Sequence, residues 1–358
     1  MAKIVHVIGT GTIGEPLTGI LCQHAKELGL DEVTFHKRTP LKTDRSKVVN
    51  LVERRGAKLV VDGDRMDDFK SMGMKPTYTS EQALERASVV IDCTPVGNQM
   101  KEQVYGDYLD NTLGFIAQGS EFGFGKMYAR GVNDKALVRG EDRFLQVVSC
   151  NTHNLAVVLQ TIGFPGGNYD NIKSGRFLCI RRANDVTQDG SFVPSPTANK
   201  HSDQQFGTHH ARDVWHLYQT LGVEIPGLFS SAIKVNSQYM HMIHFALELN
   251  EATSLDEIRT RIRENDVLSE TWKTSTNSVF SFGRDQGHFG RILNQTVFCL
   301  PSLHVSDDGK SVTGFCFTPQ DGNPILSSVS AALWFLYEDD KEHFDRLQAL
   351  KPYFFDEV

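Results

Sequence analysis

The sequence predicts an α/β protein in which a Rossmann-type parallel-sheet domain is joined to a second, α+β catalytic domain with a mostly antiparallel sheet. In residues 1–149 short β-rich runs alternate with helical stretches, a rhythm typical of parallel sheets. Residues 150–321 instead hold longer polar strands and loops. A chain of 358 residues, 40% hydrophobic and 23% charged, is long enough for two such cores.

The first domain begins with the apolar run KIVHVIG, which predicts a strand. An amphipathic helix is predicted next, and EVTFHKR, ASVVIDCTP and LGFIAQGS predict later strands. From residue 322 the pattern is helical again and could return to this domain. We therefore assign residues 322–358 to the first domain as well. The apolar faces of the two predicted helices are formed by Ile13, Leu17, Ile20 and Leu21, and by Ile325, Val329, Leu333 and Leu336.

The second domain carries the predicted strands GRFLCIRRA, RILNQTVFCLPSLHV and VTGFCFTP, with loops rich in Pro, Ser and Asn between Asp185 and Phe206. The stretch YMHMIHFALEL is predicted to be helical or mixed, with His241 and His244 on one helix face.

Composition excludes several classes of function. The formal charge of −7 leaves no basic face for nucleic acid. The N-terminus lacks the apolar core of a signal peptide, and the apolar runs are too short to span a bilayer, so we expect a cytoplasmic protein without membrane insertion. Six scattered cysteines without a CxxC pair argue against a zinc site or a disulfide framework, and we expect no metal.

The motif GxGxxG is formed by Gly9, Gly11 and Gly14, with Thr12 and Ile13 between the last two, directly after a predicted strand and before a helix. In this context Gly9 permits a tight turn, Gly11 lets the backbone approach a pyrophosphate, and Gly14 lets the helix meet the strand. The motif predicts a dinucleotide site; the alternative is a glycine turn without a ligand.

The second strand ends in His36-Lys37-Arg38, where an NAD-selective site would carry an acidic residue. Two cations at this place favour the 2′-phosphate of NADP, with NAD also accepted. Alternatively, Lys37 and Arg38 are solvated charges.

Cys150 stands at the end of the β run LQVVSC, and Asn151 and Thr152 can open a helix after it. A sulfur at a helix N-terminus is favoured as the thiolate, the attacking species in thiol chemistry. A buried structural cysteine fits the local sequence nearly as well.

A cysteine nucleophile requires a nearby base, usually histidine. The sequence offers the pairs His209-His210 and His241-His244, although either pair could be structural. Arg181 and Arg182 follow an apolar strand and could hold phosphate groups through charge-assisted hydrogen bonds, or make ordinary ion pairs.

Several motifs occur in a recognisable order: GTGTIG, VVIDCTP (89–95), QGS (118–120), VVSCNT (147–152), RRAND (181–185), THHARDV (208–214) and YMH (239–241). Together they resemble the type II, archaeal-type phosphorylating glyceraldehyde-3-phosphate dehydrogenases, from residue 4 to about residue 336. The resemblance implies that Cys150 forms a thioester and His241 is its general base. It implies a nucleotide domain completed by the C-terminal helix, a homotetramer, and a place in glycolysis or gluconeogenesis.

The resemblance also implies ligand contacts. The expected substrates are a phosphorylated aldehyde and inorganic phosphate, and the expected cofactor is NADP, with or without NAD. The residues implied around the cofactor are Gly9, Gly11, Thr12, Ile13, Gly14, Lys37, Arg38, Thr94, Pro95, Gln118 and Gly119. Those implied around substrate and phosphate are Asn151, Thr152, Arg181, Arg182, His209 and His210.

The sequence departs from the family pattern beside this substrate site. His153-Asn154 stand where Thr-Gly is usual, and Ala211-Arg212 replace Gly-Pro. Two rival functions therefore stay open. One is a dehydrogenase of the same architecture acting on another semialdehyde or acyl phosphate, and the other is a non-catalytic NADP-binding redox sensor that uses Cys150.

Overall fold

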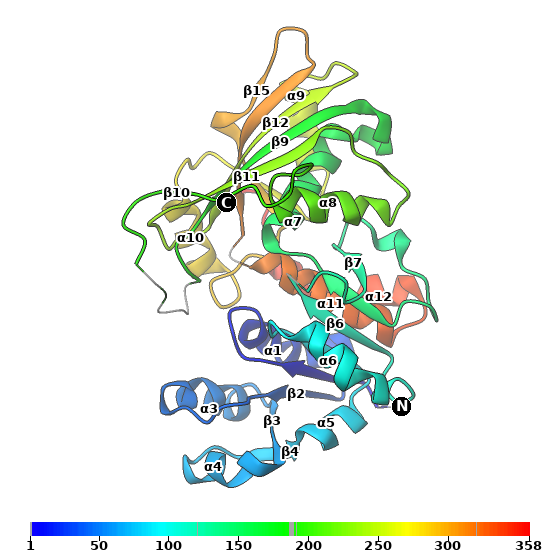
Figure 1. Cartoon of the computed structure of the whole chain (residues 1–358), viewed down its shortest axis with the longest axis vertical. Helices are drawn as coiled ribbons and strands as arrows, with labels where there is room; N and C mark the ends of the chain where they lie inside the picture. The colour runs from blue at the N-terminus through cyan, green and yellow to red at the C-terminus, as the bar shows by residue number, and fades with distance from the viewer. Residues whose placement is uncertain (1, 120, 186–189, 191, 320) are drawn as a thin grey trace. The chain divides into compact units, whose positions relative to one another are not determined.

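The computed structural model describes residues 2–119, 121–185, 190, 192–319 and 321–358 (Figure 1). Ser120 of the QGS motif, and residues 186–189 and 191 of the predicted Pro-, Ser- and Asn-rich loop, lie outside them. The chain divides into two compact units. The first comprises Met1–Tyr128, Leu137–Val147 and Ile325–Lys351, and the second Ala129–Ala136, Val148–Pro324 and Pro352–Val358. Residues 129–136, 148–149, 322–324 and 352–358, which the sequence assigns to the first domain, group with the second unit.

The first unit contains an eight-stranded sheet in which every pairing is parallel, in the order β4-β3-β2-β1-β5-β6-β8-β7. The predicted Rossmann-type sheet is thereby confirmed. Its central strands β1, β5 and β6 are buried along their whole length because helices cover both faces of parallel sheets. The strands are β1 (Ile4–Ile8), β2 (Glu32–His36), β3 (Lys58–Val61), β4 (Pro76–Thr79), β5 (Val89–Asp92), β6 (Gly114–Gln118), β7 (Lys126–Tyr128) and β8 (Phe144–Val147).

Strand β1 lies between β2 and β5, so the strand order reverses beside it. In open α/β sheets, ligands bind at the carboxyl ends of the strands at such a reversal. The loop after β1 is the glycine motif. The helices of this unit are α1 (Gly14–Gln23), α2 (Ala25–Leu28), α3 (Arg45–Glu53), α4 (Met66–Ser71), α5 (Ser80–Arg86), α6 (Gly97–Gln103) and α12 (Asp340–Leu347), together with α11 (Gly322–Leu336) from Ile325 onward.

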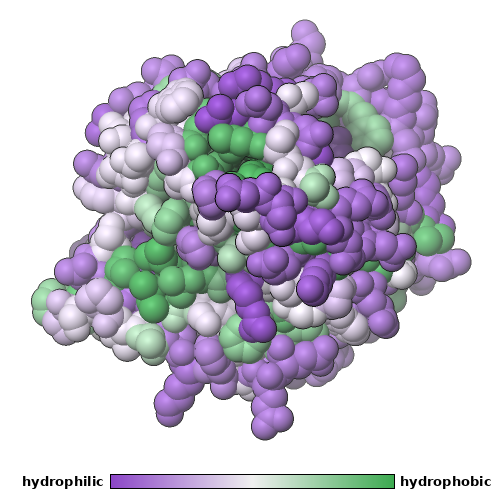
Figure 2. All heavy atoms as spheres, turned by 90° about the horizontal axis from the view of Figure 1, so that it is seen from above, coloured by the Kyte–Doolittle hydropathy of each residue, from purple (hydrophilic) through white to green (hydrophobic). Residues whose placement is uncertain are grey.

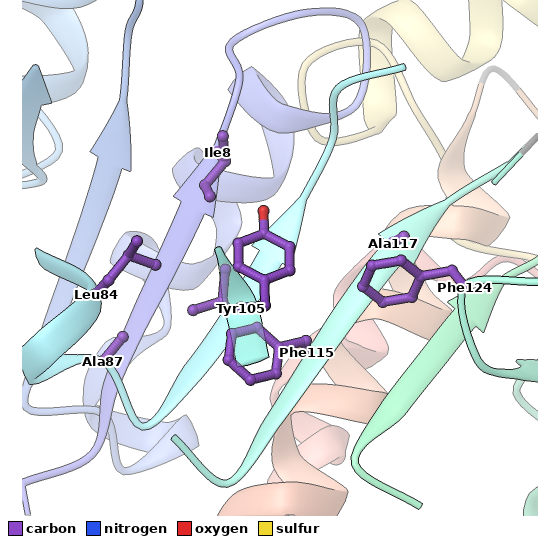
Figure 3. Packing of buried hydrophobic residues seen from close by; sticks show 8 residues of the cluster. Ile8, Leu84, Ala87, Tyr105, Phe115, Ala117 and Phe124 are labelled. Atoms are coloured by element: carbon purple, nitrogen blue, oxygen red, sulfur yellow. The ribbon is translucent and has the colours of Figure 1, made fainter. Parts of the chain in front are cut away.

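A buried aromatic cluster fixes the end of β5 (Figure 3). The rings of Tyr105 and Phe115 stack with their centroids 4.8 Å apart. The Tyr105 hydroxyl donates to Asp92 Oδ2 at 2.6 Å, while Thr94 donates its backbone N–H and its hydroxyl to Oδ1 at 2.8 and 2.6 Å. Core packing therefore determines where Thr94, a predicted cofactor residue, stands.

The second unit contains a mixed, mostly antiparallel sheet in the order β10-β11-β9-β12-β16-β14-β13, with β15 paired to β16. This confirms the predicted α+β character. The strands are β9 (Ile172–Arg181), β10 (Thr197–Ala198), β11 (Leu228–Lys234), β12 (His241–Leu249), β13 (Leu268–Thr271), β14 (Thr296–Cys299), β15 (His304–Val305) and β16 (Ser311–Thr318), and the helices are α7 (Cys150–Val158), α8 (His209–Gln219), α9 (Leu255–Arg263) and α10 (Thr276–Gln286).

Alternation along the strands places the functional side chains on one face of this sheet. Ile243 and Phe245 of β12 are fully buried, and His241 shares their face because it lies an even number of residues away. Thr318 of β16 is the register partner of His241, and α7 packs against β14, β16 and α8. The prediction that His241 and His244 share a helix face is wrong. They lie on a strand, where residues three apart point to opposite faces.

Among the described residues, no helix is both long enough and apolar enough to cross a membrane.

Candidate active site

The glycine motif forms the turn from β1 into α1. Gly9 has a φ of +92°, and a Cβ at Gly14 would lie 2.0 Å from the carbonyl oxygen of Gly9, so neither position accepts a side chain without strain. A Cβ at Gly11 would meet no protein atom within 4 Å. The motif therefore leaves open space beside bare backbone at the N-terminus of a ten-residue helix. These features fit a dinucleotide pyrophosphate.

The predicted 2′-phosphate residues follow β2. Lys37 pairs with Asp44, and this contact lowers the pKa of the Asp44 carboxyl. Arg38 is exposed. A cation that the sequence did not single out, Lys47 of α3, places its ammonium 3.2 Å from the carbonyl oxygen of Thr10 and 3.3 Å from the Glu15 carboxylate. No local motif marks Lys47, because only the fold brings α3 beside the glycine loop.

The remaining predicted cofactor residues follow the next two strands at the same sheet edge. Thr94 and Pro95 follow β5, while Gln118 ends β6 and Gly119 follows it. Gln118 donates its amide to Ser328 Oγ at 2.7 Å, and in the described part of the chain its buried Oε1 has no hydrogen-bond partner. The carboxyl ends of β1, β2, β5 and β6 thus gather all eleven predicted cofactor residues.

In the second unit, the fold brings Cys150 to His241. Cys150 is the first residue of α7, whose N-cap Ser149 accepts the backbone N–H of Thr152 at 3.3 Å. Cys150 Sγ lies 3.9 Å from His241 Nδ1, and both side chains are partly exposed. Asn323, which the sequence did not mark as a site residue, donates its amide to the carbonyl oxygen of Cys150 at 3.0 Å.

Burial and nearby charges act on the ionisation of both groups in this pair. Burial and the nearby Asp321 carboxylate raise the pKa of the Cys150 thiol well above its usual range. Burial, followed by the charges of Arg182 and Arg181, lowers the pKa of His241. Burial therefore favours the neutral thiol and the neutral imidazole over the charged forms. The helix N-terminus does favour the thiolate, through the Asn151 N–H, but burial has the larger effect.

The two predicted phosphate arginines have different surroundings. The side chain of Arg182 is 4% exposed and pairs with both Asp185 and Asp321. Arg181 ends β9 and is partly exposed; within the described residues no carboxylate lies at ion-pair distance from it. The Arg181 guanidinium is therefore available to bind an anion, whereas the Arg182 guanidinium is already paired with two carboxylates.

His209 and His210 begin α8 with their rings 4.0 Å apart. His209 is partly exposed, and burial together with the charges of Arg181 and Arg212 lowers its pKa to about 4. His210 is only 3% exposed and contacts Asn151. Asn151 and Thr152, the other predicted substrate residues, are also buried. In the described part of the chain, no cluster of three possible metal ligands occurs.

The Rossmann-type sheet, the glycine loop and the cysteine–histidine pair together define a class of protein, the oxidoreductases that use a nicotinamide dinucleotide. Within that class, the chain is similar over most of its length to archaeal glyceraldehyde-3-phosphate dehydrogenases. This confirms the resemblance seen in the motifs.

Three relatives illustrate the similarity. The glyceraldehyde-3-phosphate dehydrogenase of Methanobacterium bryantii is 28% identical over 319 residues, covering 85% of this chain and 86% of the relative. That of Methanocaldococcus jannaschii is 28% identical over 289 residues, covering 75% and 77%. That of Methanothermus fervidus is 26% identical over 323 residues, covering 86% of each. No family model matches the chain.

Proposed function

We propose that the protein is a phosphorylating glyceraldehyde-3-phosphate dehydrogenase. It oxidises D-glyceraldehyde 3-phosphate with inorganic phosphate and NAD(P) to 1,3-bisphosphoglycerate, reversibly, through a thioester at Cys150. The observation that carries this proposal is the 3.9 Å distance between Cys150 Sγ and His241 Nδ1 at the start of a helix, in a chain similar to glyceraldehyde-3-phosphate dehydrogenases.

The Cys150 sulfur forms a bond to the aldehyde carbon and gives a hemithioacetal. His241 accepts the hydroxyl proton while the carbon–oxygen double bond reforms and the carbon loses hydride. The bound nicotinamide supplies the hydride acceptor. Inorganic phosphate then attacks the thioester carbonyl, the carbon–sulfur bond breaks, and the sulfur returns to Cys150. The first backbone N–H groups of α7 stabilise the negative oxygen at both stages.

Arg181 and His209 are the proposed contacts for phosphate groups. Arg181 supplies a guanidinium without a competing carboxylate among the described residues, and a guanidinium matches phosphate oxygens in pairs. Arg182 is paired with Asp185 and Asp321. It therefore contributes positive charge to the site, but its guanidinium N–H groups are already used by the two carboxylates. Arg212, where the family pattern has proline, adds a cation close enough to His209 to lower its pKa.

NADP is the proposed cofactor, with NAD also accepted. Lys37, Arg38 and Lys47 place three cations around the end of β2 and the glycine loop. The carboxylates of Asp44 and Glu15 offset part of this charge. The remaining excess favours a 2′-phosphate without excluding a free ribose hydroxyl.

A cytoplasmic homotetramer is the proposed form of the protein. The face of the second sheet that points away from α7 carries partly exposed apolar side chains, and Figure 2 shows apolar patches left open among polar residues on the surface it views. Apolar surface of this kind commonly marks protein interfaces. The apolar side chains of that sheet face are Leu178, Ile180, Phe229, Ile233, Ala246 and Phe315.

The decisive experiment follows absorbance at 340 nm with glyceraldehyde 3-phosphate, NADP or NAD, each with and without inorganic phosphate. We expect NADPH formation that requires phosphate. Reduction that ignores phosphate would point to a hydrolysing aldehyde dehydrogenase. Absence of reduction with both cofactors would reject this substrate and move the assignment to another aldehyde or a non-catalytic binder. The Cys150→Ser variant serves as the blank for contaminating activity.

A further inference from the structure

A single buried amide joins His241 to His210. Asn151 Oδ1 lies 2.9 Å from His241 Nδ1, and Asn151 Nδ2 lies 3.2 Å from His210 Nε2. Asn151 is 2% and His210 3% exposed, so water does not supply alternative partners for these atoms. The partners at each end of the network therefore decide which nitrogen of His241 carries its proton.

At the His210 end, a chain of hydroxyl groups is compatible with one direction of donation. Ser230 Oγ accepts the Ala211 N–H at 3.0 Å, donates to the Thr208 carbonyl at 3.4 Å, and lies 2.6 Å from Thr208 Oγ1. When Ser230 donates to that carbonyl, the Thr208 hydroxyl donates to Ser230 and Thr208 Oγ1, 3.0 Å from His210 Nδ1, accepts the Nδ1–H group. His210 Nε2 then carries no hydrogen and acts as an acceptor. The group of Asn151 that faces it is therefore the NH2 group.

At the other end, Asn154 sets the same direction. Its Oδ1 accepts the Thr296 hydroxyl at 2.9 Å and the Cys316 thiol at 3.1 Å. Its Nδ2 donates to Thr318 Oγ1 at 2.9 Å, and the Thr318 hydroxyl donates to Asn151 Oδ1 at 3.2 Å. The reverse orientation would bring an NH2 group to 3.1 Å from the Cys316 sulfur, closer than these groups ordinarily approach. It would also leave the Thr296 hydroxyl with only the Phe317 carbonyl oxygen, 3.4 Å away, as an acceptor.

The geometry points to a positioning role for His210 and Asn151: they hold His241 in the tautomer with hydrogen on Nδ1, so that Nε2 is the atom that accepts the substrate proton. The Asn154 end of the network places Asn151 Oδ1 opposite His241 Nδ1, where only an N–H group makes a favourable contact, and the contacts of His210 are compatible with this orientation. This role rests on the proposed function, in which His241 is the base. It differs from the phosphate-binding role that the resemblance implied for Asn151 and His210.

The arrangement also requires a neutral His210. Both of its ring nitrogens are used inside the protein, one as donor to Thr208 and one as acceptor from Asn151. An imidazolium would offer a second N–H to the Asn151 NH2 group, which cannot accept it. Neutral His210 is thus required for the orientation of Asn151, and no ring nitrogen remains for a phosphate oxygen.

The first test is structural and needs no turnover. In wild-type protein labelled with 15N at histidine, correlations of the ring carbon protons with the ring nitrogens identify the protonated nitrogen of His241, assigned by its loss in His241→Asn. We expect hydrogen on Nδ1. Hydrogen on Nε2 would overturn the positioning role even if the enzyme oxidised glyceraldehyde 3-phosphate as proposed. Conversely, a wild-type protein without that activity but with the Nδ1–H tautomer would reject the proposed function alone.

The second test separates positioning from phosphate binding. His210→Phe keeps a ring but removes both nitrogens, and we expect kcat to fall roughly 10- to 100-fold, less than complete loss of a general base. The KM values for phosphate and glyceraldehyde 3-phosphate should stay within about twofold, because the substitution leaves the groups proposed to bind these substrates unchanged. A raised KM with unchanged kcat would make His210 a phosphate ligand and overturn the inference.

Thr318→Val covers the case in which His210→Phe fails to fold. It removes the hydroxyl that orients Asn151 from the opposite side, and we expect the same fall in kcat and a mixture of His241 tautomers. Its matched control is Thr313→Val, the same change on the same strand but on the opposite face of the sheet. Equal effects of the two variants on kcat and on the tautomer would show that the orienting network is not responsible.

Discussion

The glycine loop after β1 and the cysteine site at the start of α7 are built in opposite ways. The loop depends on residues without side chains. A Cβ at Gly14 would collide with the Gly9 backbone, and a Cβ at Gly11 would occupy open space. The cysteine site works through side chains gathered from α7, α8, β12 and β16, which lie far apart in the sequence. Adding atoms should therefore damage the first region, whereas removing or reorienting them should damage the second.

Replacing the nucleophile should have the largest effect. In Cys150→Ser, the hydroxyl is a far weaker nucleophile than the sulfur, and we expect turnover to fall below detection. NADP affinity, measured by fluorescence titration, should match that of the wild type because the cofactor residues are unchanged. Turnover at the wild-type rate would rule out the thioester mechanism, and a change in affinity would show that the two regions are not independent.

Removing the proposed base should have the next largest effect. His241→Asn should lower kcat by roughly two to four orders of magnitude, as for loss of a general acid or base. Steady-state kinetics at saturating substrate measure this fall. His244→Gln, on the other face of β12, is the control and should behave like the wild type. A wild-type rate in His241→Asn would remove this residue from the mechanism.

Adding one methyl group should damage the loop. Gly11→Ala should weaken NADP binding at least about tenfold, equivalent to about 1.4 kcal/mol, because the new Cβ occupies space proposed for the pyrophosphate. The melting temperature should not change, since that Cβ meets no protein atom within 4 Å. Gly106→Ala is the matched control, with equally open surroundings away from the glycine loop. Unchanged affinity in Gly11→Ala would argue against a dinucleotide at this loop.

Charge removal beside the loop should have a smaller, selective effect. Arg38→Ala should raise the Kd for NADP roughly tenfold, the loss of one charge-assisted hydrogen bond, and leave the Kd for NAD within twofold. Because Arg38 is exposed, the difference should shrink at high salt. Lys58→Ala, an exposed lysine on β3, is the control. An equal loss of NAD and NADP affinity would mean that Arg38 does not recognise the 2′-phosphate.

The same contrast explains how much the sequence could predict. The loop is one contiguous stretch between a strand and a helix, so both its structure and its proposed ligand follow from spacing alone. Cys150 at a helix start could also be predicted locally. Its neighbours could not, because Thr318, Asn323 and Lys47 reach their sites only through the fold. The stretch that forms β12 is predicted to be helical or mixed, because two histidines three apart suggest a helical face, although Ile243, Phe245, Leu247 and Leu249 alternate along it.

The buried His153, three residues after Cys150, should make a small, pH-dependent contribution to the free energy of unfolding. His153 is 0% exposed, and burial lowers its pKa to about 4, against 6.5 in the unfolded chain. Between these values the unfolded state binds a proton that the folded state does not. This histidine therefore makes the free energy of unfolding fall by about 1.4 kcal/mol for each pH unit of acidification.

Urea unfolding at several pH values from 4.5 to 6.5 measures this dependence. In His153→Gln, the slope of the free energy of unfolding against pH should be smaller by that amount. The exposed His304→Gln is the control. Parallel curves for His153→Gln and the wild type would mean that His153 is protonated equally in both states, and that its neutrality beside Cys150 is not imposed by the fold.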